Sequence, residues 1–337
     1  MRGVVRGLIG LLVLWVLYWA AAGWGLRQSL AGWFAAQEAR GWQVETGEIA
    51  LEGPLGGFPL QHRTRVVRPT LADPSSGVAW RADWLSFESP AIWPGHQTLR
   101  FADGEQRLSW YDRTAIIDTT GLTAALSLAP GLALEVEEMS LTSGPWRIGN
   151  EARVALSAED LELRMSQLTA PETYALRAEA HGFEPGDDLR RLLRRAPELP
   201  QTFEALTLRA DVTFDRPWDR QALEARRPQP RQIDLDRLEA HWGPMRLLST
   251  GTLSVDEQGI PSGDLALQVE AWQEFLDVAV DTGLLHPEMR DQAARIIGML
   301  ARASGNAEDL DITLGFRDGS IWIGPFPLGP APRLILR

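Results

Sequence analysis

Cysteine and lysine are both missing from this chain of 337 residues, and all of its 33 positive side chains are arginines. Without cysteine the chain has no disulfide scaffold, no thiolate-bound zinc or iron–sulfur centre and no thiol nucleophile. Histidine is scarce, because only 5 occur and none has a second histidine within the next four residues. The sequence therefore predicts no metal site and no cofactor.

Positive charge is also in deficit, since 45 acidic residues give a net charge of −12. This balance argues against an anionic partner bound over the whole surface, nucleic acid above all. A hydrophobic fraction of 45% with 23% charged residues excludes a disordered chain. The length predicts one large domain or two modest ones with a real core.

An uncharged run of 20 residues lies between Arg6 and Arg27. At about 1.5 Å per helical residue it just spans a hydrocarbon layer of about 30 Å. Arg2 and Arg6 precede it, which predicts a single-pass protein of a bacterial inner membrane with a cytoplasmic N-terminus and a periplasmic body. The expected anchor residues are Leu8, Leu12, Trp15, Trp19 and Trp24.

A cleavable signal peptide is the alternative, because residues 8–17 form an apolar core and Ala20, Ala21 and Ala22 offer a small-x-small cleavage site. The bulky Trp15 and Trp19 within the run favour an uncleaved anchor. The run has no polar face, which argues against a buried core helix.

The expected organisation is an anchor or uncleaved signal over 1–26, a juxtamembrane helix over 27–41 and a β-rich periplasmic domain over 42–337. Two sheet halves, 42–200 and 201–337, are one way to divide that domain. Trp33 and Phe34 lie in the juxtamembrane helix, either on the bilayer surface or packed under the domain, and the sequence leaves both options open.

Beyond Trp42 the apolar residues alternate with polar ones, as in strands with one dry and one wet face. Parallel strands would show continuous apolar runs instead. The pattern predicts a mainly β (α+β) fold: a large curved antiparallel sheet with a helical hairpin near the C-terminus. The clearest alternating runs are residues 132–136, 174–178, 206–214, 265–269 and 310–316.

Helical spacing recurs in residues 186–196, 218–226, 271–284 and 288–303, and the last two form the predicted hairpin. In the first of these, four arginines surround a leucine face, which suggests contact with anionic head groups at a membrane surface. Pairing with Asp187 and Asp188 inside the same helix is the alternative. The four residues are Arg190, Arg191, Arg194 and Arg195.

Close acidic pairs could carry out acid–base catalysis if burial separated their pKa values. Asp234 with Asp236, and Asp309 with Asp311, alternate with apolar residues and are expected on a solvated face. Glu137 with Glu138 and Asp187 with Asp188 complete the set. No hydrolase, nucleotide-binding or metal-binding motif occurs. We therefore expect no enzyme, and an envelope hydrolase remains an alternative.

The C-terminal third carries the segments His241-Trp242-Gly243-Pro244, Gly251–Asp256, Gly259–Leu265 and Gly319–Pro332, and the N-terminal part carries Gly57-Phe58-Pro59. With these motifs the chain resembles a bacterial domain-of-unknown-function family, number 2125, over most of its length. That resemblance implies no activity and no catalytic residue. More distantly, the membrane helix followed by one-faced strands is similar to AsmA-like envelope proteins, which implies lipid handling.

Three functional hypotheses follow. The first is a membrane-anchored module whose sheet binds lipid or another hydrophobic ligand. The second is a non-enzymatic scaffold that tethers other envelope proteins, with its apolar face filled by its own side chains. The third is the envelope hydrolase. The partners expected are the inner membrane and a lipid or another envelope protein, and nucleic acid is not expected.

Overall fold

A computed structural model describes the whole chain except residues 1, 54, 94, 112, 151–152, 187–199, 201, 225, 282–285, 305–308 and 337. Antiparallel strands hold 53% of the residues and helices 20%. The sheets are open, a long apolar helix comes first and short helices lie near the C-terminus, so the predicted fold class is confirmed. The chain forms two compact units: unit 1 is Met1–Leu128 with Ile148–Ala152, and unit 2 is Ala129–Arg147 with Arg153–Arg337.

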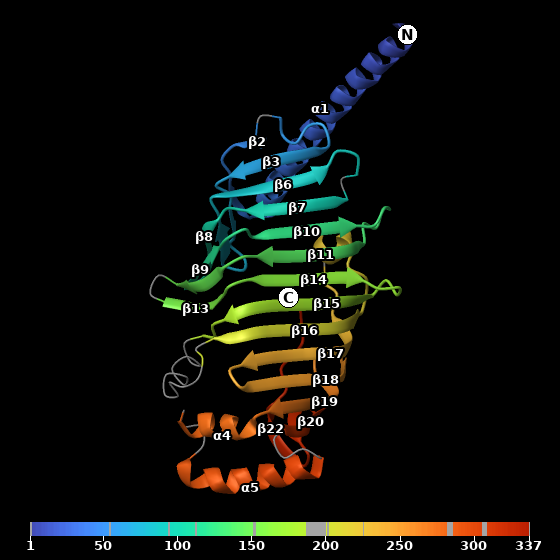
Figure 1. The fold of residues 1–337 in the computed structure, drawn as a ribbon. Helices are drawn as coiled ribbons and strands as arrows, with labels where there is room; N and C mark the ends of the chain where they lie inside the picture. Colours follow the sequence, from blue (N-terminus) through green and yellow to red (C-terminus); the bar gives the residue numbers. More distant parts are fainter. Residues whose placement is uncertain are drawn as a thin grey trace. The chain divides into compact units, whose positions relative to one another are not determined.

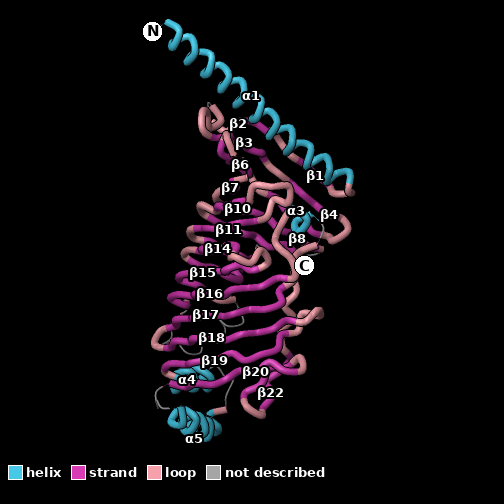
Figure 2. Tube along the Cα trace, turned by 90° about the vertical axis from the view of Figure 1, so that its right-hand side faces the viewer, coloured by secondary structure: helices cyan, strands magenta, loops and turns pink. Residues whose placement is uncertain are grey.

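Unit 1 begins with a single uninterrupted helix, α1 (Arg2–Ala39), which joins the predicted anchor and juxtamembrane segments. It ends where Gly41 adopts a positive φ of 92°, a conformation that glycine reaches without strain. Within this helix Phe34 is buried whereas Trp33 is 48% exposed, so Phe34 packs under the domain. The first part of α1 projects beyond the strands of the unit (Figure 1, Figure 2).

Two antiparallel sheets follow in unit 1. In spatial order the strands of the first are β2 (Ile49–Leu51), β3 (Gln61–Val67), β6 (Trp84–Pro90), β7 (His96–Phe101) and β10 (Thr123–Leu128). Those of the second are β1 (Gln43–Glu45), β4 (Thr70–Asp73), β5 (Val78–Arg81), β8 (Gly104–Trp110), β9 (Arg113–Thr119) and the unit 1 part of β12 (Trp146–Asn150).

Unit 2 is built on one antiparallel sheet whose strands follow each other almost in chain order (Figure 1). They are β11 (Val136–Ser143), β14 (Leu161–Gln167), β15 (Thr173–Phe183), β16 (Phe203–Phe214), β17 (Pro230–Trp242), β18 (Met245–Val255), β19 (Pro261–Glu270), β20 (Asp309–Arg317), β21 (Ser320–Ile323) and β22 (Phe326–Pro330). The short β13 (Arg153–Ala158) bridges to Glu184 just after β15. Strands β15 and β16, which flank in sequence the division into halves that the sequence offered, pair with each other in this unit.

Three further helices belong to unit 2: α3 (Arg220–Glu224), α4 (Trp272–Asp281) and α5 (Pro287–Ser304). They confirm the helices expected within 218–226, 271–284 and 288–303. The helix expected over 186–196 lies outside the described residues, apart from Gly186.

One expected strand is wrong at its start. Leu132 is fully exposed and Leu134 has a positive φ of 52°, so the segment before Val136 is a loop and not a strand. The alternation of Leu132, Leu134 and Val136 is too short to determine structure. Backbone bonds from Val136 to Trp218 and from Arg220 to Ala133 hold this loop instead.

Candidate functional site

The sheet of unit 2 separates apolar from charged side chains onto opposite faces. Successive residues of a strand point to opposite sides, so the register of paired residues shows which side chains share a face. One row runs Leu163, Ala178, Leu208 and Leu238 across four neighbouring strands. The next row along the same strands is Arg164, Arg177, Arg209 and Arg237. A β-bulge around Asp236 keeps β17 in phase with its neighbours.

The apolar face carries a band of large side chains that the described residues of unit 2 leave partly exposed. Met139, Leu163 and Leu238 are 43%, 37% and 41% exposed. The other members of the band are half-buried. We define this aliphatic strip as Met139, Leu141, Leu163, Leu176, Leu208, Leu238, Leu265, Leu267, Ile312 and Leu314.

Aromatic rings pack against one another near both ends of these strands. At one end Phe203 lies 5.3 Å from Trp242 and 6.2 Å from Phe183, measured between ring centroids. At the other end Phe214 lies 5.9 Å from Tyr174 and 5.7 Å from Trp218. Tyr174 is fully buried, and its hydroxyl accepts a 3.0 Å hydrogen bond from the backbone NH of Trp218. Tyr174 and Phe214 have the same alternation as Leu176 and Leu208, so packed rings close the strip at this end.

Helices α4 and α5 cover the apolar face at only one place. Trp272, Leu276 and Ala301 form a buried cluster that packs on Val269 of β19 and Leu310 of β20. Both views show the two helices at the β19–β20 end of the sheet (Figure 1, Figure 2). Towards β11, Met139 and Leu163 stay exposed.

The strip therefore forms a long apolar surface with packed aromatic rings at one end of its strands. Its residues come from seven of the eight strands from β11 to β20, and Ser249 of β18 lies in register between Leu238 and Leu267. At a strand spacing of about 4.8 Å the eight strands extend over about 34 Å. A polar ligand would gain no favourable binding free energy on such a surface. A flexible hydrocarbon chain laid across the strands would remove apolar area from water at about 25 cal/mol per Å².

The opposite face is charged, and three of the four arginines in its row have an acidic partner. Four arginines that stand in register across β14 to β17 would repel one another without partners. Glutamates lie between them: Arg164 is 3.3 Å from Glu162, and Arg209 is 3.5 Å from Glu179. Because these pairs are exposed, each contributes little to stability, but together they balance the charge of the row.

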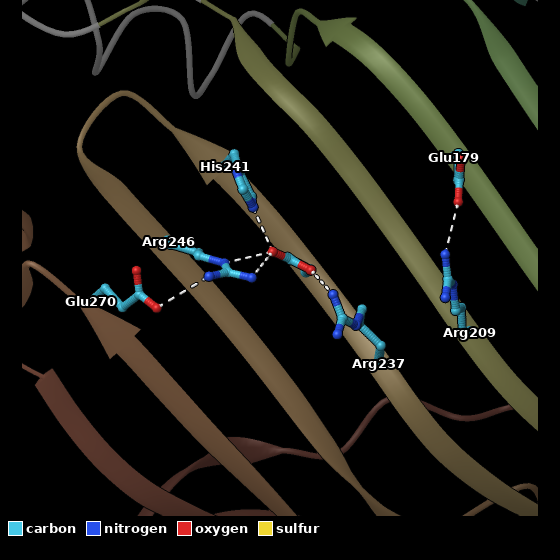
Figure 3. A network of polar contacts seen from close by, with 7 residues as sticks. Glu179, Arg209, Arg237, His241, Arg246 and Glu270 are labelled. Atoms are coloured by element: carbon cyan, nitrogen blue, oxygen red, sulfur yellow. Dashed lines mark hydrogen bonds and ion pairs between the residues drawn. The ribbon is translucent and has the colours of Figure 1, made fainter.

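Glu239 is the centre of the tightest network on this face (Figure 3). Its carboxylate is 6% exposed and accepts hydrogen bonds from Arg237 at 2.8 Å and from Arg246 Nε at 2.5 Å. His241 Nε2 lies 2.5 Å from the same carboxylate. The bond with His241 and those with the two arginines outweigh the effect of burial and lower the pKa of Glu239 to about 2.

A carboxylate held in this way stabilises the sheet and is poorly suited to acid–base catalysis. At neutral pH it is ionised and has no proton to give, and its lone pairs are taken up by three cationic or ring-nitrogen partners. Glu52 in unit 1 resembles it: burial raises its pKa, but hydrogen bonds from Ser86 and Arg65 bring the pKa below the ordinary value. Among the described residues, no group of three or more His, Asp or Glu is arranged to hold a metal ion.

In unit 1 the helix α1 is fastened to the end of β3 and β6. The hydroxyl of Tyr18 donates a 2.7 Å hydrogen bond to the carbonyl of Ala91, and the indole NH of Trp19 donates a 2.9 Å bond to that of Gln61. The Trp19 ring stacks on His62 at 4.9 Å and meets the edge of Phe58 at 5.4 Å. These contacts form a specific joint between the helix and the domain.

His62 is 4% exposed and has no hydrogen-bond partner among the described residues for either ring nitrogen. A Cβ atom at Gly23 of α1 would lie 3.1 Å from Nδ1 of this ring, so glycine allows the helix to approach closely. Burial, together with the charge of Arg27, lowers the pKa of His62. The ring is therefore neutral and serves as a packing surface for α1.

The sequence-predicted anchor residues divide into two groups. Leu8, Leu12 and Trp24 are 62%, 60% and 63% exposed, as lipid-facing residues would be. Trp15 is half-buried, with its ring 5.6 Å from that of Tyr18, and Trp19 belongs to the joint with the domain. Residues 190, 191, 194 and 195, the four arginines proposed to contact a membrane surface, lie outside the described residues.

Sequence reasoning missed the network at Glu239 and the role of Trp19. The alternation Arg237, Glu239, His241 signals one charged strand face, but the contribution of Arg246 depends on the hairpin register. No local sequence pattern relates Trp19 to Phe58 and His62, because these residues lie about forty positions apart in the sequence.

Two comparisons with other proteins bear on identity. A search of curated proteins finds no match. One helix, Val4–Ala39, is long and apolar enough to cross a membrane. A family model for uncharacterized proteins conserved in bacteria matches residues 19–332, nearly the whole chain from the joint of α1 onwards. The chain therefore belongs to the family DUF2125.

Proposed function

We propose that this protein is anchored in a bacterial inner membrane by α1 and binds an acyl chain or a similar hydrophobic ligand on the aliphatic strip of unit 2. The observation that carries the proposal is the partial exposure of Leu163, Leu238 and Met139 on the face that the packed rings of Tyr174 and Phe214 close at one end. A structural core would cover such residues, because their burial stabilises a fold by about 1.5–3 kcal/mol each.

The direction of insertion follows from charge. Arg2 and Arg6 precede the apolar run, which favours a cytoplasmic N-terminus and a periplasmic body. In that location the strip would meet lipids that move within the envelope. A similarity to AsmA-like proteins belongs to this proposal, and it gives no support by itself, because a fold does not determine function.

The test is a comparison of bound lipid. The full-length protein is purified from bacteria in a mild detergent, and the solvent extract is analysed by mass spectrometry. Leu238→Arg places a charge in the strip and is expected to remove most of the retained lipid. Leu248→Arg makes the same change on the charged face of the neighbouring strand, opposite Glu239, and is expected to leave retention unchanged.

A photoactivatable phospholipid added to the purified protein gives a second measurement. Crosslinked peptides should contain strip residues of β14 to β17. Wild-type protein that retains no more lipid than Leu238→Arg, with crosslinks spread over both faces, would contradict the proposal.

A scaffold is the second candidate, because the α4–α5 pair already covers Val269 and Leu310 at one end of the apolar face. If this role is correct, crosslinking in cells gives a stoichiometric protein partner. In that case the purified protein carries no lipid. The hydrolase hypothesis has no support in the Glu239 network, whose carboxylate is saturated by its partners.

A further inference from the structure

The two parts of α1 differ in their surroundings. From Val4 to Leu14 the large apolar side chains are more than half exposed, with Val4 at 68% and Leu14 at 66%. From Tyr18 onwards the helix is bonded to the domain through Ala91 and Gln61. The helix therefore leaves the domain at about Tyr18.

Three large apolar side chains lie in the loops around this exit point. We define the apolar rim as Leu55, Leu60 and Ile92, which are 61%, 70% and 74% exposed. The backbone NH of Ala91 donates a 2.8 Å bond to the carbonyl of Leu60, so Leu60 and Ile92 flank the same end of the β3–β6 pair. The NH of Phe58, which packs on Trp19, bonds the carbonyl of Leu55 at 3.0 Å.

The rim continues the apolar surface of the helix. Ile92 and the α1 residues Leu8, Leu12 and Trp15 line one open apolar hollow of about 950 Å³. Figure 2 shows the loop that follows β2 beside the helix, where the free part of α1 begins. Water in such a hollow has few polar partners, whereas hydrocarbon fits it.

The length of the free helix points to the occupant. Residues 7–17, the uncharged part ahead of the first domain contact, rise by only about 17 Å at 1.5 Å per residue. A bilayer core is about 30 Å thick. The remaining apolar residues of the run, Tyr18–Leu26, lie alongside the domain. Helix tilt would only shorten the span further, so the mismatch is removed by thinning of the bilayer or by insertion of the end of the domain into it.

On the basis of the anchor in the proposed function, we infer that the apolar rim of unit 1 inserts into the outer leaflet of the same phospholipid bilayer that α1 spans. The rim and the helix then form one membrane-seated surface, with Ile92 and Leu60 at the level of the glycerol and upper acyl region. An anchor on a loose tether would need no apolar residues at this end and no bonds from Tyr18 and Trp19 to the domain.

Single cysteines test this directly, because the chain has none of its own. Ile92→Cys and Leu60→Cys are labelled with the fluorophore NBD in the full-length protein. They are reconstituted in vesicles of phosphatidylcholine with a minor fraction of phosphatidylglycerol. Leu12→Cys reports insertion of α1. Tyr111→Cys, at a site that is 82% exposed in unit 1 and outside the rim, is the matched control.

Quenching by a nitroxide lipid labelled near its head group is expected to be roughly threefold stronger for the two rim labels than for Tyr111→Cys, with iodide quenching weaker by a similar factor. The same result at both rim positions supports the inference.

If Leu12→Cys is quenched by lipid while both rim labels stay as open to iodide as Tyr111→Cys, the rim inference fails and the anchor stands. If Leu12→Cys is not quenched, both fail. Rim labels that are shielded from iodide without quenching by lipid would indicate a protein contact, which also overturns the inference.

Discussion

The two faces of the unit 2 sheet differ in how far their side chains find partners within the protein. On the charged face Glu239 has three partners, and exposed ion pairs such as Arg209 with Glu179 lie along the same row of arginines. On the apolar face Leu163 and Leu238 keep more than a third of their surface open to solvent. The sheet thus supplies partners for its charged side chains but leaves apolar surface uncovered. A ligand would therefore add most stability on the apolar face.

The largest expected effect is at the border of the strip. Tyr174→Ala removes a fully buried ring that packs on Phe214, and it should cost about 4 kcal/mol in the free energy of unfolding. Urea unfolding of the full-length protein in detergent measures it. Tyr174→Phe loses only the hydrogen bonds that the hydroxyl accepts from the NH of Trp218 and from Gln167 Nε2, and it should cost about 1 kcal/mol. Equal costs for the two variants would show that the ring itself is not part of a closed border.

On the charged face, Glu239→Gln should cost about 3 kcal/mol, because it leaves Arg237 and Arg246 without their buried counter-charge. The same urea experiment applies. Glu179→Gln is the control, since its exposed contact with Arg209 at 3.5 Å contributes under about 0.5 kcal/mol. If the two changes lower the free energy of unfolding equally, the network at Glu239 stabilises the sheet no more than an exposed ion pair.

The pH dependence of stability sharpens this comparison. The folded-state pKa of Glu239 is about 2, below its ordinary value of 4.5. The stability that its ionised form contributes is therefore complete above pH 4.5 and is lost as the pH falls towards 2. The difference in unfolding free energy between wild type and Glu239→Gln should shrink over that interval by at most about 3 kcal/mol. A difference that stays constant down to pH 3 would contradict the assignment.

The smallest expected effect is in the strip itself. Leu238→Ala should cost less than about 1 kcal/mol in lipid-free protein, because the side chain is already 41% exposed. Added phospholipid should stabilise the wild type more than this variant, as judged by the midpoint of thermal unfolding. A cost of 3 kcal/mol or more without lipid would mean that the strip is an ordinary core.

Much of the fold could be predicted from the sequence, because a sheet with one wet and one dry face leaves a period of two in the chain. The runs at 206–214, 265–269 and 310–316 lie within β16, β19 and β20, and the helical spacing at 271–284 and 288–303 marks α4 and α5. The run at Leu132 failed because three alternating residues fit a loop equally well.

The site was harder to predict for a physical reason. Alternation shows that Leu163 and Leu238 are apolar and share a face, but it says nothing about whether a second layer covers them. The pairing of Glu239 with Arg246 depends on the hairpin register, and the stacking of Trp19 on His62 depends on where a distant strand ends. Coverage and long-range contact are properties of the folded chain that local patterns do not encode.

The joint between α1 and unit 1 determines how accessible the three alanines of the helix are to a protease. Ala20, Ala21 and Ala22 have the residue sizes that a signal-cleaving protease selects, but here they lie within continuous helix, between Trp19 stacked on His62 and the buried Gly23. Proteases bind their substrates as extended strands, so a cut at this site requires the helix to unwind and its contacts to break. Folding of unit 1 onto the helix thus shields the peptide bonds of Ala20, Ala21 and Ala22 from such a protease.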